Sequence, residues 1–183
     1  GRILGAREAA GKGLVNRVVA DADIIALQEV DFRFGARPEA LPRGLIRDAT
    51  GLVAVEITGR TGEQSLGWHG QTILMRPDLA AAATVRRLPL PGLEPRGAVT
   101  ARIAGLQIVG THLGLLRTWR LRQMGTILDH LHGTAQRCVV AGDFNEWSPL
   151  NGFSPWKGDL TVVAPGPSYH ASRPIAPLDR FAH

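Results

Sequence analysis

Residues 98–111, Ala-Val-Thr-Ala-Arg-Ile-Ala-Gly-Leu-Gln-Ile-Val-Gly-Thr, are the stretch that decides the fold. Two apolar or alternating runs, 98–103 and 106–111, are separated only by Ala104-Gly105, and so short a connection suits an antiparallel hairpin. Amphipathic helices are predicted at 7–20 and 117–131, and a loop with no more than one helical turn at 31–50. Further short strands are predicted at 23–27, 53–57, 71–75, 139–144, 160–163 and 178–182. Seven or more strands with only two substantial helices favour an α/β (α+β) sandwich of two packed, mainly antiparallel sheets with helices outside.

The composition is that of one globular domain. The chain has 183 residues, of which 44% are hydrophobic, so a single domain over 1–183 is expected. No apolar run approaches the roughly 20 residues of a membrane span, so no integral membrane segment is predicted. A cytoplasmic monomer is expected. The single cysteine, Cys138, excludes an internal disulfide, and its apolar neighbours predict a buried thiol.

The charge balance favours an anionic partner. Lys and Arg number 21 against 16 Asp and Glu, which gives a net charge of +5. Such an excess suits a phosphate ester, nucleic acid or an acidic membrane surface. Aromatic residues make up only 5% of the chain, so no stacking platform for single strands is evident.

Polar side chains follow three of the predicted strands. Glu29 comes after the first of them, His112 after the second strand of the hairpin, and Asp143 and Asn145 after the run at 139–144. Any one of these residues could simply be a solvated residue at a strand end. Their joint occurrence is a stronger indication of a functional site than any of them alone. Carboxylate and amide oxygens are hard ligands that suit Mg²⁺, which proteins hold with one or two carboxylates and water.

The motifs resemble the endonuclease/exonuclease/phosphatase superfamily in order and over nearly the whole chain. They are Asp-Ile-Ile-Ala-Leu-Gln-Glu at 23–29, Glu-Pro-Arg-Gly-Ala at 94–98, Gly-Thr-His-Leu at 110–113 with Arg120 and Gln123, Val-Ala-Gly-Asp-Phe-Asn at 140–145, and Leu-Asp-Arg-Phe at 178–181. The resemblance implies a four-layered α/β sandwich and a Mg²⁺-dependent hydrolase of phosphate esters, with Mn²⁺ as an alternative metal. The resemblance is greater to the general bacterial members, sphingomyelinases, deadenylases and deoxyribonucleases of the superfamily than to its DNA-repair enzymes.

The resemblance also implies a role for each matching residue. Glu29 matches the acidic metal ligand, and His112 matches a histidine that hydrogen-bonds the scissile phosphate. Asp143 matches the carboxylate that orients the attacking water, and Asn145 its neighbour that positions water and phosphate. Asp179 matches the carboxylate that holds a second histidine. Arg96 lies where some members contact phosphate, although an ion pair at the surface is an equally simple explanation for an arginine there.

Two family features have no match in the sequence. The family begins with a strand that carries an Asn and ends with Ser-Asp-His. Asn16 falls within the predicted first helix, His183 follows Asp179 too closely, and His170 is only a loose alternative. We therefore expect the domain to lack the first and last strands of the family fold.

Two functions remain open at this point. The first is a phosphodiesterase, nuclease or phosphatase, and its substrate is a nucleic acid, a phospholipid, an inositol phosphate or another phosphate ester. The alternative is a catalytically impaired phosphate-binding or interaction domain that keeps the fold. Trp147 and Trp156 are predicted to pack in the core or anchor their loop, although either could touch a substrate, and Trp68 and Trp119 are assigned to the core or its edge.

Overall fold

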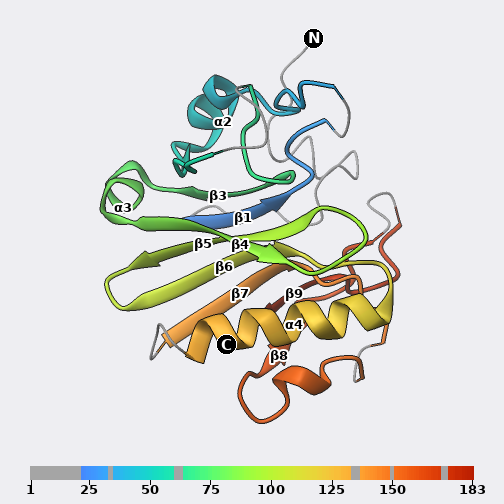
Figure 1. Cartoon of the computed structure of the whole chain (residues 1–183). Coiled ribbons are helices and arrows are strands. Elements are labelled where there is room, and N and C mark those ends of the chain that lie inside the picture. Colours follow the sequence, from blue (N-terminus) through green and yellow to red (C-terminus); the bar gives the residue numbers. More distant parts are fainter. Residues whose placement is uncertain (1–21, 33–34, 60–63, 133–136, 149–150, 170–172) are drawn as a thin grey trace.

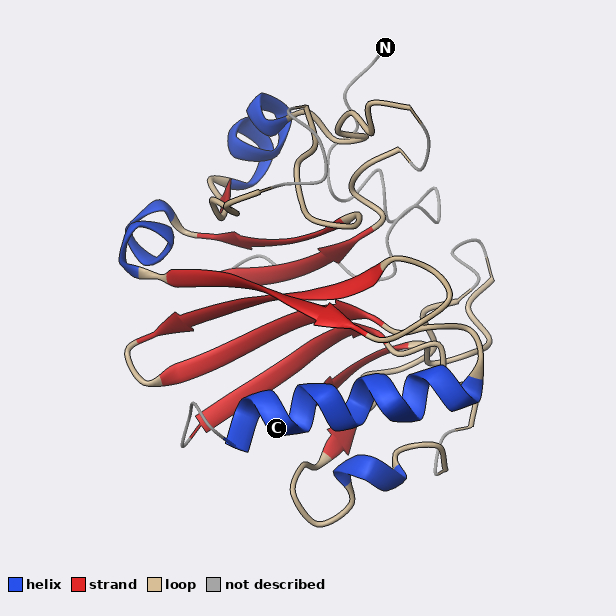
Figure 2. Cartoon of the chain, viewed as in Figure 1, coloured by secondary structure: helices blue, strands red, loops and turns tan. Residues whose placement is uncertain are grey.

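Two β-sheets packed face to face form the centre of the molecule in the computed structural model (Figures 1 and 2). The structure describes residues 22–32, 35–59, 64–132, 137–148, 151–169 and 173–183, and the predicted helix at 7–20, Asn16 and His170 lie outside these ranges. The smaller sheet has the order β1-β3-β2 and the larger β4-β5-β6-β7-β9-β8. The strands are β1 (Ile24–Gln28), β2 (Val53–Ala54), β3 (Gln71–Met75), β4 (Thr84–Leu90), β5 (Arg96–Ile103), β6 (Leu106–His112), β7 (Arg137–Asp143), β8 (Val162–Val163) and β9 (Asp179–Ala182).

The pairing within both sheets is antiparallel except between β6 and β7, which run parallel. A parallel pair needs a crossover connection, and α4 (Arg117–His132) provides it. The predicted hairpin is confirmed as β5 and β6, and the predicted two-sheet sandwich with outer helices is confirmed as a whole.

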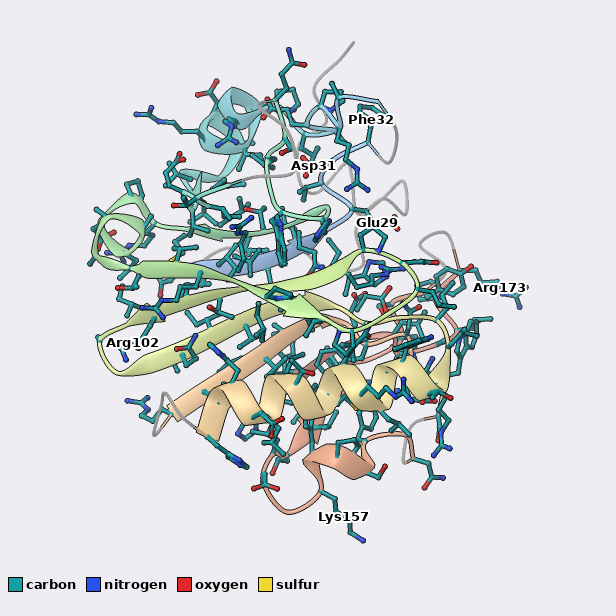
Figure 3. All side chains as sticks on the ribbon, viewed as in Figure 1. Glu29, Asp31, Phe32, Arg102, Lys157 and Arg173 are labelled. Carbon is teal, nitrogen blue, oxygen red and sulfur yellow. The ribbon has the colours of Figure 1, made fainter. Side chains whose placement is uncertain are left out.

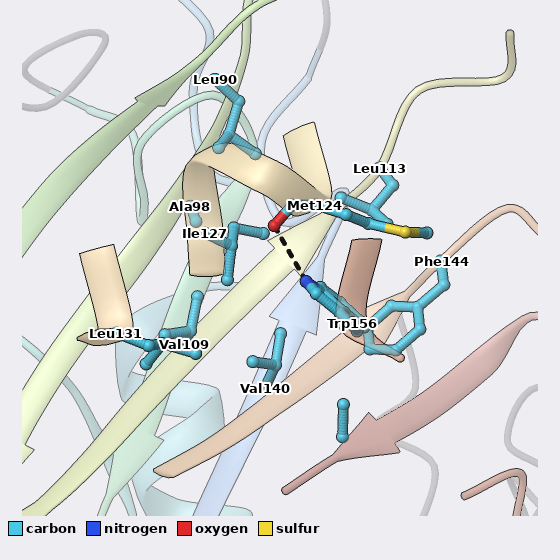
Figure 4. Close-up of a cluster of buried hydrophobic side chains, with 11 residues drawn as sticks. Leu90, Ala98, Val109, Leu113, Met124, Ile127, Leu131, Val140, Phe144 and Trp156 are labelled. Carbon is cyan, nitrogen blue, oxygen red and sulfur yellow. Dashed lines mark hydrogen bonds between the residues drawn. The ribbon is translucent and has the colours of Figure 1, made fainter. Parts of the chain in front are cut away.

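Three apolar clusters separate four layers. One lies between the two sheets and includes Ile73, Val99 and Ile108. A second lies between the large sheet and α4, where the indole Nε1 of Trp156 donates to the Met124 carbonyl at 2.9 Å (Figure 4). The third joins the outer face of the small sheet to α2 (Arg43–Thr50) and its flanking loops. Because both faces of the large sheet are covered, its central strands are continuously apolar rather than alternating.

Several predicted boundaries were wrong for identifiable reasons. Residues 31–50 contain the helix α2, which buries only Ile46 and starts after Pro42 without a polar N-cap, so it left little periodic signal. The sequence also gave no indication of α3 (Pro77–Ala82). The strand predicted at 53–57 is only Val53–Ala54. β4 was missed because it contains Pro89, which is tolerated where β4 forms the edge of the sheet.

None of the helices in the described part of the chain is long and apolar enough to cross a membrane.

Candidate active site

The register of the large sheet brings three of the predicted site residues onto one line. His112 pairs with Asp143 across the parallel strands β6 and β7, and Asp143 pairs with Asp179 across β7 and β9. Asn145 follows two residues after Asp143. These residues are up to 67 positions apart in sequence (179 − 112), and only the strand order makes them neighbours.

His112, Asp143 and Asn145 form a connected polar group. Nε2 of His112 lies 3.5 Å from Oδ2 of Asp143. The backbone N–H of Asn145 donates to Oδ1 of Asp143 at 2.8 Å, and its side-chain Nδ2 donates to the Leu113 carbonyl at 2.7 Å. The Asn145 amide therefore joins the segments that follow β6 and β7, and it is buried.

Gly142 allows the small sheet to approach this group. It has φ +143°, and a Cβ there would overlap the carbonyl oxygen of Thr111 and lie 3.0 Å from Nε2 of Gln28 on β1. The end of β1, where Glu29 is located, thereby comes close to Asp143. Figure 3 shows Glu29 at the end of the sheets to which the β4–β5 connection also extends.

Both Glu29 and Asn145 have left-handed backbone conformations, with φ of 57° and 49°. Asparagine visits this region readily, whereas for glutamate it is uncommon and costs free energy. Backbone strain of this kind is concentrated at functional sites, where the surrounding structure holds it in place. At Glu29 the strained turn directs the chain from β1 into the segment that lines the cleft described next.

A cleft of about 530 Å³ opens beside this group. Its polar lining includes Glu29, Asp31, Arg37, His69, Glu94, Arg96 and His112. The side chain of Arg96 is only 11% exposed, and its Nη2 lies 2.8 Å from Oε2 of Glu94. The ion pair expected as the simple explanation of Arg96 is thus present, with its Glu94 side chain 62% exposed, and both residues also line the cleft.

Burial and neighbouring charges together change the acidity of Asp143. Burial is the largest cause and raises the pKa of Asp143 to about 6, with the charges of Asp179 and Glu29 adding to the increase. The backbone hydrogen bond from Asn145 and the charge of Arg96 oppose this increase. Two neighbouring carboxylates thus add to the raised pKa of Asp143, and a cation placed among the three groups would stabilise their negative charge.

The donor set fits a magnesium ion held mainly by water. In the described part of the chain, no three Asp, Glu, His or Cys side chains are close enough to share a metal. Mg²⁺ does not need such a cage, because it commonly keeps several waters and takes one or two carboxylates. Glu29, exposed at the cleft and within electrostatic reach of Asp143, suits that mode.

A buried ion pair supports the loop that carries Asn145. Nη2 of Arg120 lies 2.9 Å from Oε2 of Glu146, with both side chains at most 10% exposed. Nη1 of Arg120 also donates to the Leu115 carbonyl, so one guanidinium holds the segments after both β6 and β7. Arg180 is buried on β9 and donates to the carbonyls of Glu146 and Ser148 at 2.8 and 2.9 Å. The site therefore rests on two buried arginines.

Two residues of the cleft were missed in the sequence. Asp31 accepts the N–H groups of Leu66 and Gly67, at 2.6 and 3.3 Å, and so holds the loop before β3. His69 lies two residues before β3, and burial lowers its pKa with help from the charges of Arg37 and Arg87. Apart from the family motifs, the predicted site residues were drawn only from polar residues that follow strands. Because β3 is antiparallel to β1, residues before β3 lie at the same edge as Glu29.

Asp179 lies at the Asp143 end of β9, and His183 follows at the other end, where its backbone pairs with Thr161. Four residues of strand span about 13 Å, so His183 does not serve as the histidine partner of Asp179. Trp68 and Trp156 are buried, as expected. Trp147 is not in the core: it is 57% exposed and packs edge-on against Tyr169 at 5.6 Å between ring centroids.

The chain is thus an α/β sandwich of two packed sheets. Acidic, amide and imidazole groups at the ends of its central strands form a polar site at one edge of the sheets. Within this fold class, the chain belongs to the Endonuclease/Exonuclease/phosphatase family, whose model matches residues 3–181. No curated protein matches the chain.

Several solved structures share the fold. Sphingomyelinase C from Streptomyces griseocarneus is 21% identical with a TM-score of 0.57, over 97% of this chain and 75% of that one. The Haemophilus ducreyi cytolethal distending toxin is 16% identical with a TM-score of 0.54, over 98% and 79%. The human Nocturnin catalytic domain, determined with a bound sulfate anion, is 17% identical with a TM-score of 0.53, over 87% and 68%. At such identities the likeness shows the fold alone.

Proposed function

We propose that the chain is a Mg²⁺-dependent hydrolase of phosphate esters. The observation that carries this proposal is the group formed by His112, Asp143 and Asn145 beside a cleft that also contains Glu29 and Arg96. Hydrolysis of a phosphate ester needs an oriented water and donors that compensate charge on the phosphate oxygens. This chain's residues can supply both.

Each residue has a place in the proposed reaction. Ionised Asp143 accepts a hydrogen bond from the attacking water and orients it toward phosphorus. His112 donates from its ring to a phosphate oxygen. Asn145 uses one hydrogen of Nδ2 for the Leu113 carbonyl, and because an amide nitrogen carries two, the other can reach the phosphate.

The cleft wall would hold the phosphate and the metal. Arg96 places a cation beside His112, with Glu94 fixing its guanidinium. Glu29 would hold Mg²⁺, or Mn²⁺ in its place, which when bound neutralises charge on phosphate oxygens. Asp179 contributes negative charge beside Asp143, and the histidine that the family pairs with it is not supplied by His183.

The proposal is tested with three substrates: bis(4-nitrophenyl) phosphate, 4-nitrophenyl phosphate and supercoiled plasmid. Each is incubated with the full chain in Mg²⁺, in Mn²⁺ and with a chelator. We expect metal-dependent turnover of at least one substrate and none with the chelator. If no substrate turns over in either metal, while a phosphate ester still binds in calorimetry, the chain is the impaired phosphate-binding domain instead.

His112→Ala is expected to lower kcat by about 10²–10³-fold, because it removes a preorganised donor to the phosphate in the transition state. Initial rates on the best of the three substrates provide the measurement. His132→Ala is the matched control, since His132 is an exposed histidine on α4 that pairs with Asp159 at 3.2 Å, and it should leave kcat within about twofold. Equal rates for wild type and His112→Ala would remove His112 from the phosphate site.

A further inference from the structure

A groove with an apolar lining lies directly beside the cleft. Its walls come from the β4–β5 connection, the β6–α4 connection and the first turns of α4, which meet at one end of the large sheet (Figure 1). The apolar part of the lining consists of Gly92, Leu93, Gly114, Leu115, Leu116 and Trp119. Glu94 and Arg96 line both this groove and the cleft, so the two spaces adjoin and share part of their wall.

Gln123 holds the walls of this apolar groove in place. Its side chain is buried beneath them, where Oε1 accepts the Gly114 N–H at 2.8 Å and Nε2 donates to the Pro91 carbonyl at 2.8 Å. One amide thus links the β4–β5 connection to the β6–α4 connection. Both ends of this amide are engaged, and apart from the ion-paired Glu94 and Arg96 the remaining side chains of the lining are three leucines and Trp119.

Three leucines at the mouth of the groove are exposed to solvent. Leu93, Leu115 and Leu116 are 79%, 65% and 59% exposed. Single exposed leucines need no explanation, but three around one preformed hollow mark a binding surface for an apolar group. Their position next to Arg96 places that group within reach of a phosphate held at Arg96 and His112.

We propose that the apolar groove binds a short alkyl part of the substrate, attached through the phosphate ester that the cleft holds. This inference rests on the proposed function and deepens it by naming the substrate class: phosphodiesters with one aliphatic arm. The groove has a volume of about 90 Å³. An engineered apolar cavity of roughly 150 Å³ holds benzene, so this groove suits a few methylenes better than a nucleobase.

The test uses a series of 4-nitrophenyl phosphodiesters whose second ester group is methyl, propyl, butyl or hexyl. Burial of one CH₂ is worth about 0.8 kcal/mol, which converts to up to about fourfold in kcat/KM per methylene. We expect this increase over the first few carbons, carried mainly by a lower KM, and then a plateau once the groove is full. Thymidine 4-nitrophenyl phosphate is included, and its preference over the butyl ester would overturn the proposal.

Leu115→Ser and Leu116→Ser are expected to flatten the dependence of kcat/KM on the length of the alkyl group. Val163→Ser is the matched control, because Val163 is an exposed apolar residue on the edge strand β8 and does not line the groove. The proposal would be overturned if kcat/KM of the active wild type did not depend on the length of the alkyl group. It would also be overturned if both leucine variants kept the increase of kcat/KM with length.

Calorimetric titration with monomethyl and monobutyl phosphate makes the same comparison without turnover. If the chain hydrolyses nothing but binds butyl phosphate several-fold more tightly, and loses that gain in Leu116→Ser, the groove is supported and the proposed function fails. If the two phosphates bind equally, the groove proposal fails whether or not the chain is active.

Discussion

Asp143→Asn is expected to lower kcat/KM for the best phosphate ester by about 10²–10⁴-fold, the range typical of a lost general base. An asparagine keeps an oxygen that can accept the Asn145 N–H, so the hydrogen bond of 2.8 Å can persist. The variant lacks the negative charge that orients water. Steady-state rates with saturating Mg²⁺ measure the effect, and an unaffected rate would remove Asp143 from the mechanism.

The same variant should be more stable than wild type above pH 6 when metal is removed by chelator. The pKa of Asp143 is about 6 in the fold, against an ordinary value of 3.8 for an aspartate, so the folded state binds more protons between these pH values. Stability therefore falls as pH rises from about 4 to 6, by at most about 3 kcal/mol, and then levels off. Thermal melts should show a higher melting temperature for Asp143→Asn than for wild type at pH 7.5 and no difference at pH 4. A lower melting temperature of the variant at pH 7.5 would show that its loss of activity reflects unfolding.

Arg120→Met is expected to destabilise the chain by about 3–5 kcal/mol, because it leaves the buried carboxylate of Glu146 without its charged partner. Although burial by itself raises the pKa of Glu146, the hydrogen bond from Ser148 and the Arg120 guanidinium lower it below its usual value. The carboxylate is therefore ionised at neutral pH. Urea unfolding at pH 7 measures the loss, which is large against the stability of a typical domain.

Arg117→Met provides the control, since Arg117 lies on the same helix one turn earlier and is exposed, and it should change stability by less than about 0.5 kcal/mol. Adding Glu146→Gln to Arg120→Met should cost much less than the sum of the two single changes, because both remove the same ion pair. Additive losses would show that Arg120 and Glu146 do not act as a pair.

The central strands and the longest helix could be predicted because burial on both faces leaves a strong signal. Residues 71–75 and 106–111 are apolar with little interruption, and α4 was expected at 117–131 and lies at Arg117–His132. β4 and α2 could not be predicted, because each buries little of its surface and tertiary packing decides its conformation.

The candidate site was predictable residue by residue but not as an arrangement. Glu29, Arg96 and His112 were expected together and share one cleft. His69 reaches the cleft through antiparallel pairing that the sequence did not reveal, and Asp31 lies there because it follows Glu29 by two residues. The roles of His112, Asp143, Asn145, Asp179, Glu29 and Arg96 stay predictions. The single domain over 1–183 without the first and last strands of the family fold also stays a prediction. The sequence of the full gene tests it.

The segment that connects β6 to β7 determines whether His112 and Asp143 come together. His112 faces Asp143 only because the thirty residues 113–142 return the chain to the same end of the sheet in this register. A slip of one residue turns every side chain of a strand to the opposite face. An insertion or deletion between these two residues would therefore damage the site unless it were absorbed outside β7. The site thus depends on the register of β6 and β7, which the connecting chain must preserve, as much as on the identities of His112 and Asp143.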